Sequence, residues 1–212
     1  MKKLFGNKIL NYLIEFIFIF SSVYFAFWLT NQEAVRKIKI IEEKAIKALH
    51  QELNENLNEL QTSIQFHENV RNQLFIYNDS INENLVNAES LHAYNHLRKI
   101  FTRNSNSIGL PDIKKNAWEM LKSSEAYVYV DYELASELGL LYIIQEGGVE
   151  ATSKQIVSDV FNSLSIYQKE KSEEVLLLTA YMFRELAGQE EFLIFKIKEN
   201  IEGLENYYDY LK

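Results

Sequence analysis

The sequence of 212 residues contains no cysteine, one proline and seven glycines. The lack of cysteine excludes disulfide bonds, thiol catalysis and zinc sites built from cysteine. Proline and glycine are the strongest breakers of regular structure, and neither occurs between Gly6 and Gly109. About a hundred consecutive residues can therefore be helical with only polar loops as interruptions, and we predict an all-α fold.

Basic residues are also scarce, with 22 lysines and arginines against 30 aspartates and glutamates. Three lysines and Glu15 precede residue 31, so the chain from there on carries a net charge of −10, against −8 for the whole sequence. An acidic domain repels the phosphates of nucleic acids, which excludes a nucleic-acid partner. The basic stretch from Arg36 to Lys47 can still contact lipid headgroups.

One long apolar run is present, from Ile9 to Leu29, and no charged residue occurs between Phe16 and Gln32. About 21 helical residues extend roughly 31 Å, which matches the hydrocarbon core of a bilayer. We therefore predict a short basic tail at 1–8 and a transmembrane helix at 9–30, whose partner is the lipid bilayer. The anchor residues are Tyr12, Glu15, Phe16, Phe20, Tyr24 and Trp28.

A cleaved signal peptide is the alternative for this run, but its apolar region is shorter and is followed by small residues. Phe25, Phe27 and Trp28 occupy the place where cleavage would fall. Glu15 lies about one turn inside the span, where an ionised side chain is costly. It can reach the headgroups, contact a partner helix, or carry protons as in subunits of ion-driven membrane complexes.

The next segment, 31–80, is predicted to be a long stalk or core helix that can continue directly from the membrane. Its apolar residues repeat near every 3.6 positions, which is typical of a helix lying along a core. Leu49, Leu53, Leu57 and Leu60 form the centre of this face. The turn-forming cluster Asn78-Asp79-Ser80 is expected to end the helix.

Residues 81–212 are predicted to add the remaining helices of the same domain, giving an elongated antiparallel bundle. Helices are expected at about 88–102, after a cap at Asp112, after a cap at Asp131 up to Gly147-Gly148, and at about 150–168, 172–187 and 189–210. The alternating segment 125–130 is expected to be extended. Ile197, Ile201 and Leu204 form a seam that packs against the stalk or against a second copy.

No set of residues indicates catalysis. The spacing of Glu89 and His92 is the one used by ferritin-like metal sites, but those sites need a second such pair, which the sequence lacks. A phosphate-binding loop, a serine elbow and a zinc-type His-Glu-x-x-His motif are also missing. We therefore predict no catalytic residue, metal site, cofactor or small-molecule substrate. The alternative is a membrane-tethered enzyme or metal protein built around Glu89 and His92.

Several motifs resemble a family of uncharacterised short single-pass membrane proteins that is common in Bacteroidota. The similar features are Lys2-Lys3 before the span, Glu15 at its entry, Asn31 at its exit, the segment Leu121-Lys122-Ser123-Ser124, and Leu134 with Leu141-Tyr142. The chain departs from the family at Trp28, which lies three residues before Asn31, and at Glu125 and Ile143.

The resemblance implies a helical domain anchored in the inner membrane and lying outside the cytoplasm, and it implies no activity. The lysines and arginines that flank the span are nearly balanced, with a slight excess on the C-terminal side that favours a cytoplasmic domain. Our functional prediction is a non-enzymatic accessory, scaffold or sensor-like protein that presents an interaction surface near the membrane. Its partners are a second copy or another protein of a membrane complex.

Overall fold

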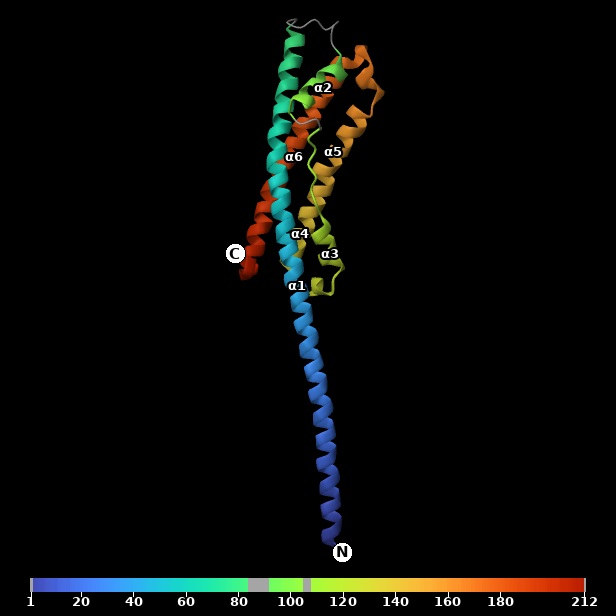
Figure 1. Cartoon of the computed structure of the whole chain (residues 1–212), viewed down its shortest axis with the longest axis vertical. Helices are drawn as coiled ribbons and strands as arrows, with labels where there is room; N and C mark the ends of the chain where they lie inside the picture. The colour runs from blue at the N-terminus through green and yellow to red at the C-terminus, as the bar shows by residue number, and fades with distance from the viewer. Residues whose placement is uncertain (1, 84–91, 105–107, 212) are drawn as a thin grey trace.

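The computed structural model describes residues 2–83, 92–104 and 108–211, and these ranges contain helices and no strand (Figure 1). The predicted all-α fold is confirmed. One very long helix extends beyond the rest of the molecule toward the N-terminus, and the other helices pack along its C-terminal half.

Helix α1 (Lys2–Asn82) is a single helix of 81 residues. At a rise of about 1.5 Å per residue it is roughly 120 Å long. The predicted span at 9–30 and the predicted stalk at 31–80 are consecutive parts of this one helix. It ends two residues beyond Ser80, close to the turn-forming cluster.

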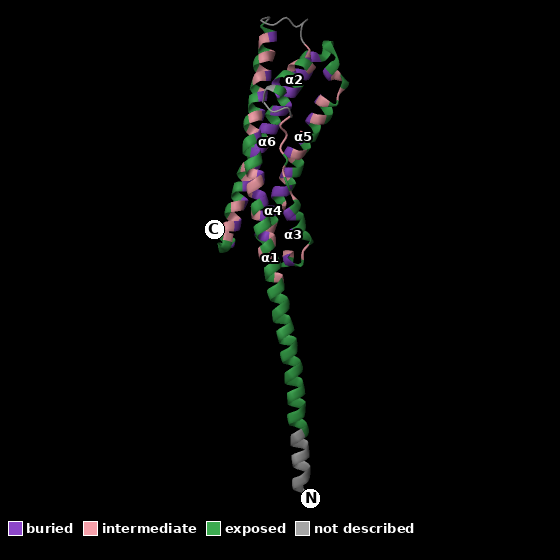
Figure 2. Ribbon diagram, viewed as in Figure 1, coloured by how far each residue is buried: buried purple, intermediate pink, exposed green. Residues whose placement is uncertain are grey.

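The surroundings of α1 change along its length, as Figure 2 shows. From Tyr12 to Lys37 every side chain is exposed. Burial begins at Ile46 and then recurs on one face. The buried positions of α1 are Ile46, Leu49, Glu52, Leu53, Asn56, Leu60, Ser63, His67, Val70, Leu74 and Ile81. From Tyr12 to Lys37 the helix thus has no protein packed against its side chains, while the C-terminal half forms one wall of a core.

Helix α6 (Ser172–Tyr207) runs beside α1 and provides the opposite wall of the core. The prediction of two helices separated at Gly188 is wrong, because the helix passes through that residue. A single glycine in a helix costs only about 1 kcal/mol relative to alanine. Burial of Leu186 and Leu193 on either side of it more than offsets this cost.

Shorter helices cover the remaining side of the core. They are α2 (Ala93–Asn104), α3 (Asn116–Ser123), η2 (Glu125–Tyr129), α4 (Tyr132–Gln145), η3 (Glu146–Glu150), α5 (Ala151–Ile156), η4 (Val157–Phe161), η5 (Leu164–Tyr167), η6 (Lys169–Lys171) and, after α6, η7 (Asp209–Leu211). The cap predicted at Asp131 is confirmed, because its carboxylate accepts hydrogen bonds from the backbone N–H groups of Glu133 and Leu134.

Three local predictions are wrong. The segment expected to be extended at 125–130 is the 3₁₀ helix η2. In a strand Ala126, Val128 and Val130 would share one face, but here Ala126 and Val130 are buried and Val128 is exposed. Gly147-Gly148 does not end a helix, since the π-helical η3 carries the chain from α4 into α5. Asp112 does not cap α3, which begins only at Asn116.

The segment that leads into α3 lies against α1 and is shaped by Gly109. This glycine has a φ of +73°, in the region that favours glycine. A side chain there would also collide with the ring of Phe66. The close approach keeps residues 108–115 along the surface of α1 and so positions α3.

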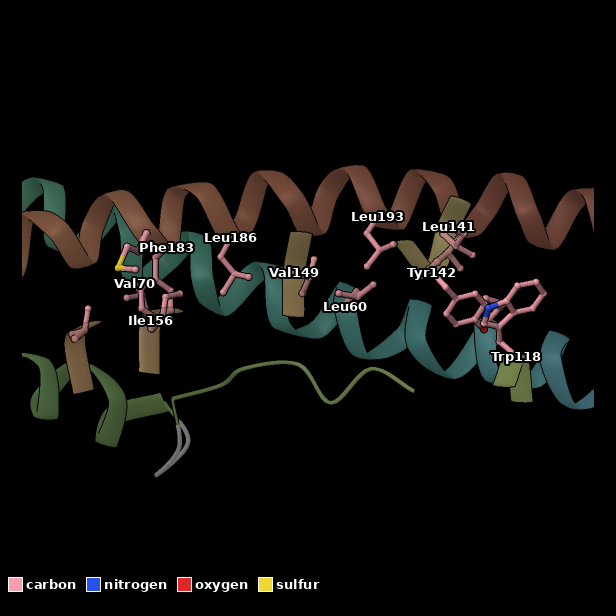
Figure 3. Close-up of a cluster of buried hydrophobic side chains, with 14 of the residues drawn as sticks. Leu60, Val70, Trp118, Leu141, Tyr142, Val149, Ile156, Phe183, Leu186 and Leu193 are labelled. Carbon is pink, nitrogen blue, oxygen red and sulfur yellow. The ribbon is translucent and has the colours of Figure 1, made fainter. Parts of the chain in front are cut away.

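The core lies between α1, α6 and the helices from α4 to η4. In Figure 3, Phe183, Leu186 and Leu193 of α6 point toward α1. Trp118 of α3 and Tyr142 of α4 stack at one end, with ring centroids 5.4 Å apart and planes within 2°. The other labelled core residues are Leu60, Val70, Leu141, Val149 and Ile156.

Candidate functional site

The predicted anchor residues form one exposed zone on α1. Tyr12, Phe16, Phe20, Tyr24 and Trp28 recur at every fourth position, and each is at least 44% exposed. Among the described residues, α1 is the one helix long and apolar enough to cross a membrane, with a mean hydropathy of 1.8 in its apolar window. None of that window is buried against protein, so its side chains are free to contact hydrocarbon.

Glu15 lies within this zone and is exposed as well. It is therefore the one acidic side chain on the exposed apolar surface between Tyr12 and Gln32 that the structure describes.

The predicted core faces of α1 and α6 lie within the bundle. Leu49, Leu53 and Leu60 are completely buried, and Leu57 packs partly buried against the same core. On α6, Ile197 and Leu204 are completely buried, and Ile201 packs partly buried against the core. The seam predicted near the C-terminus is therefore used within the chain.

A buried carboxylate, Glu52, joins three helices at the end of the domain nearest the exposed part of α1. It is 6% exposed. Its Oε2 atom accepts a hydrogen bond from the N–H of Ala117 at 2.7 Å, and Oε1 accepts one from the N–H of Trp118 at 3.4 Å. The hydroxyl of Tyr142 also donates to Oε1, at 2.7 Å. Glu52 of α1 thus caps the N-terminus of α3, whose own N-cap residue provides no side-chain cap.

Burial and the neighbouring Glu52 keep Tyr142 in its neutral form. Burial raises the pKa of the Tyr142 phenol, and the neighbouring Glu52 charge raises it further. The phenol therefore remains a donor to the carboxylate at physiological pH, and it links α4 to α1.

Asn56, one turn further along α1, holds the segment before α3. Its side-chain amide donates to the carbonyl of Lys114 at 2.7 Å and accepts from the N–H of Lys114 at 2.8 Å. The side chain of Gln145 donates to the same carbonyl at 3.3 Å. Sequence reasoning missed these residues because they look like ordinary polar residues of an acidic helix. The available signal is that positions 52 and 56 continue the period of the buried face.

We expect Glu52→Ala to destabilise the domain by about 3 kcal/mol, because buried donors on α3 and α4 lose their acceptor. The matched control is Glu55→Ala, which removes an exposed partner of Lys114 and should change stability much less. Urea unfolding, followed by the fluorescence of Trp118 in a Trp28→Phe background, measures both effects. Equal effects of the two substitutions would contradict the assigned role of Glu52.

A second buried polar pair joins the middle of α1 to α6. The Nδ1 atom of His67 lies 2.9 Å from both carboxylate oxygens of Glu190, and both side chains are completely buried. Burial raises the pKa of Glu190 above its usual value, although the contact with His67 partly opposes the rise. The ring of Phe183 packs edge-on to His67 at 5.3 Å, and His67 Nε2 finds no hydrogen-bond partner in the described part of the chain.

A third polar group ties the end of α6 to α1 where the buried face begins. The hydroxyl of Tyr208 donates to Glu42 at 2.9 Å, and Nε2 of His50 lies 3.0 Å from a carboxylate oxygen of Glu205. Burial, reinforced by Glu42, raises the pKa of Tyr208. The C-terminal tyrosines therefore act as packing and hydrogen-bonding groups.

The alternative metal site falls partly outside the described residues, because Glu89 does. His92 is described, and its Nδ1 atom is buried without a hydrogen-bond partner among the described groups. The nearby His96 stacks on Tyr77 at 3.8 Å, and burial lowers its pKa. Within the ranges that the structure describes, no group of three histidines or carboxylates could hold a metal ion.

A shallow apolar groove of about 500 Å³ lies between α1 and α3, beside Glu52. Ile41, Ala45 and Ala48 of α1 line one side, and Ala117 and Met120 of α3 line the other. Met120 is 70% exposed. The groove offers apolar contact area, while the carboxylate of Glu52 at its base is already engaged in three hydrogen bonds.

The polar groups described above connect helices of the bundle to one another. The pair of His67 and Glu190 is closed to solvent, and Glu52 and Asn56 have their hydrogen bonds satisfied by the backbone and Tyr142. Comparison of the chain with family models, with curated proteins and with solved structures found no match.

Proposed function

We propose that this protein is a non-enzymatic, single-pass membrane protein whose helical domain presents an interaction surface at a set height above the bilayer. We place it in the inner membrane of a bacterium with the domain outside the cytoplasm. Its role is that of an accessory, scaffold or sensor-like subunit.

The observation that carries this proposal is the continuity of α1. The exposed apolar zone ends at Leu29, and the first completely buried residue is Ile46. The helix between them extends about 26 Å, and its side chains are exposed as far as Lys37. Because it contains neither glycine nor proline, nothing in its sequence makes a hinge. Any tilt or rotation of the membrane segment is therefore passed to the helix on which the domain is built.

Two further observations support the non-enzymatic part of the proposal. The buried polar side chains at Glu52, Asn56, His67 and Glu190 hold helices together, and the two buried ionisable groups of the pair are out of reach of a substrate. The surface instead offers exposed apolar side chains, such as those of Met120 and Val128, at the end of the domain nearest the exposed stretch of α1.

Membrane anchoring is tested by replacing Ile19 and Val23, in the middle of the span, with aspartate. Each charge costs about 3 kcal/mol at the centre of a membrane helix, so we expect the protein to leave the membrane fraction after alkaline carbonate washing. The matched control replaces Val35 and Ile40, which are also exposed but lie outside the span, and should stay in the pellet. Retention of the Ile19/Val23 variant would contradict the anchor.

The set height is tested by placing Gly-Pro at Ala34-Val35, since proline breaks a helix interior. The control places Ala-Ala at the same positions. Purification from native membranes in mild detergent, with mass spectrometry of co-purifying proteins, measures the outcome. We expect both variants to remain in the membrane, and the Gly-Pro variant alone to lose the proteins retained by the parent chain. An unchanged set of proteins would contradict the proposal.

A further inference from the structure

The outward face of α6 carries an apolar stripe whose side chains are about half exposed. Leu178, Tyr181, Phe192 and Phe195 are each 43–53% exposed. Together with Glu185, Gly188 and Glu199, they occupy positions three and four residues apart in turn. At 100° per residue this stripe lies opposite the buried face of α6, which contains Leu186, Leu193 and Ile197.

Gly188 lies in the middle of the stripe, and no packing contact within the described part of the chain requires a glycine there. A methyl group built on its Cα would meet no atom within 4 Å. Glycine weakens a helix interior relative to alanine, so a packing reason is expected where glycine occurs there. In the stripe Gly188 lies between Glu185 and Phe192, and an exposed glycine there leaves space for a helix from another molecule to approach closely.

We propose that this face pairs with α6 of a second copy, with the two helices parallel. The orientation rests on the proposed function, because copies anchored in one bilayer share their direction and a two-fold axis between them must be normal to the membrane. Since α6 runs alongside α1, each residue of the stripe then faces its own counterpart. The alternating spacing of three and four residues is that of a helix pair in a coiled coil.

The charges beside the stripe fit this orientation. Glu191 and Lys196 flank the stripe on opposite sides and are five residues apart. In a parallel pair these are the positions between which charges bridge from one helix to the other. Glu191 of each copy can therefore reach Lys196 of its partner, where it would compete with Glu199 of the same chain, which lies 2.7 Å from Lys196 Nζ.

Two carboxylates, Glu185 and Glu199, interrupt the apolar seam. Glu185 accepts a hydrogen bond from Gln189 at 3.2 Å, and Glu199 accepts one from Lys196 at 2.7 Å. In the parallel pair each of these carboxylates faces its own counterpart, so repulsion between like charges lowers the stability of the helix pair. The pairing is thus suited to the high local concentration of a membrane surface.

The upper part of the stripe is held in place before any partner arrives. The ring of Tyr181 packs edge-on against Phe75 of α1 at 5.5 Å, and the guanidinium of Arg184 lies 5.0 Å from the centre of the same ring. Fixing an aromatic side chain in advance lowers the entropy lost on binding.

Cysteine cross-linking of the full chain in native membranes tests the pairing, because the natural sequence contains no cysteine. Leu178→Cys and Phe192→Cys place one thiol each on the stripe. Ile143→Cys is the control, since Ile143 of α4 is 68% exposed on another helix. After mild oxidation, we expect covalent dimer from both stripe variants and about tenfold less from the control, a ratio equivalent to about 1.4 kcal/mol.

The space at Gly188 is tested in the Phe192→Cys background. We expect Gly188→Leu to lower the yield of covalent dimer by about tenfold, a loss equivalent to about 1.4 kcal/mol. Gly147→Leu is the matched control, because Gly147 also has no atom within 4 Å of a built Cβ and should leave the yield unchanged.

Each other outcome overturns the pairing. Equal yields from Phe192→Cys and Ile143→Cys would indicate random collision, and a product of another mass would assign the stripe to a different protein. Failure of the proposed membrane anchoring is distinguishable from failure of the pairing. It would be seen in the carbonate-wash experiment, where the parent chain itself would be lost from the membrane fraction.

Discussion

Leu53→Asp is expected to unfold the helical domain. Leu53 is completely buried on the face of α1 that meets the core. Removal of a buried leucine side chain costs about 2–5 kcal/mol, and an unpaired buried charge adds several more. The sum is comparable with the total stability of a typical domain, about 5–15 kcal/mol. The measurement is urea unfolding of the full chain in detergent, followed by Trp118 fluorescence in the Trp28→Phe background.

Two control substitutions on the same helix test whether the loss of stability follows the burial of the replaced side chain. Leu57→Asp should cost clearly less than Leu53→Asp, because Leu57 is only partly buried, and Asn58→Asp at an exposed position should change little. A Leu53→Asp variant that unfolds at the same urea concentration as the parent would show that this face of α1 is not packed in the core.

The second large effect is expected from His67→Leu, which leaves the carboxyl group of Glu190 buried without its partner. Leaving a buried polar group without its hydrogen-bond partner costs about 1–3 kcal/mol, and more where that group is charged. The double variant with Glu190→Leu should recover most of this loss, because two apolar side chains of similar size fill the site without a charge. The double-mutant cycle therefore gives a large coupling energy.

The matched control is His50→Leu, since His50 makes a similar contact with Glu205 but is partly exposed to water. It should cost much less. Additive effects of His67→Leu and Glu190→Leu would show that the two side chains do not interact.

The same pair predicts the direction of a pH dependence. Burial raises the pKa of Glu190 above its usual 4.5, so the folded chain holds this proton to a higher pH than the unfolded chain does. Wherever the folded state binds more protons, stability falls as the pH rises. Stability contributed by Glu190 is therefore greatest below pH 4.5 and declines as the pH rises through the folded-state pKa.

His67→Leu should extend the pH range over which stability declines toward neutral pH, because it removes the contact that lowers the pKa of Glu190. Glu190→Gln should remove this pH dependence of stability. Urea midpoints measured across the acidic range distinguish these curves, and a midpoint in His67→Leu that rises with pH through the same range would contradict the assignment.

The sequence by itself determined the helical class of the fold, the long apolar zone and most of the α1 face. These follow from local properties: the lack of glycine and proline from residue 7 to 108, the uncharged run after Glu15, and the helical period of Leu49, Leu53 and Leu60. Such signals act within a few turns of one helix, so they can be read without knowing what lies opposite.

Only the tertiary structure decided which glycines interrupt a helix and which polar residues are buried. Gly188 was expected to end a helix, yet packing of α6 against α1 on both sides of it carries the helix through. Glu52, His67 and Glu190 look like solvated residues of an acidic chain, and their burial depends on partners 65 to 123 positions away. Because burial and hydrogen bonding are properties of the assembled bundle, no local pattern could assign them.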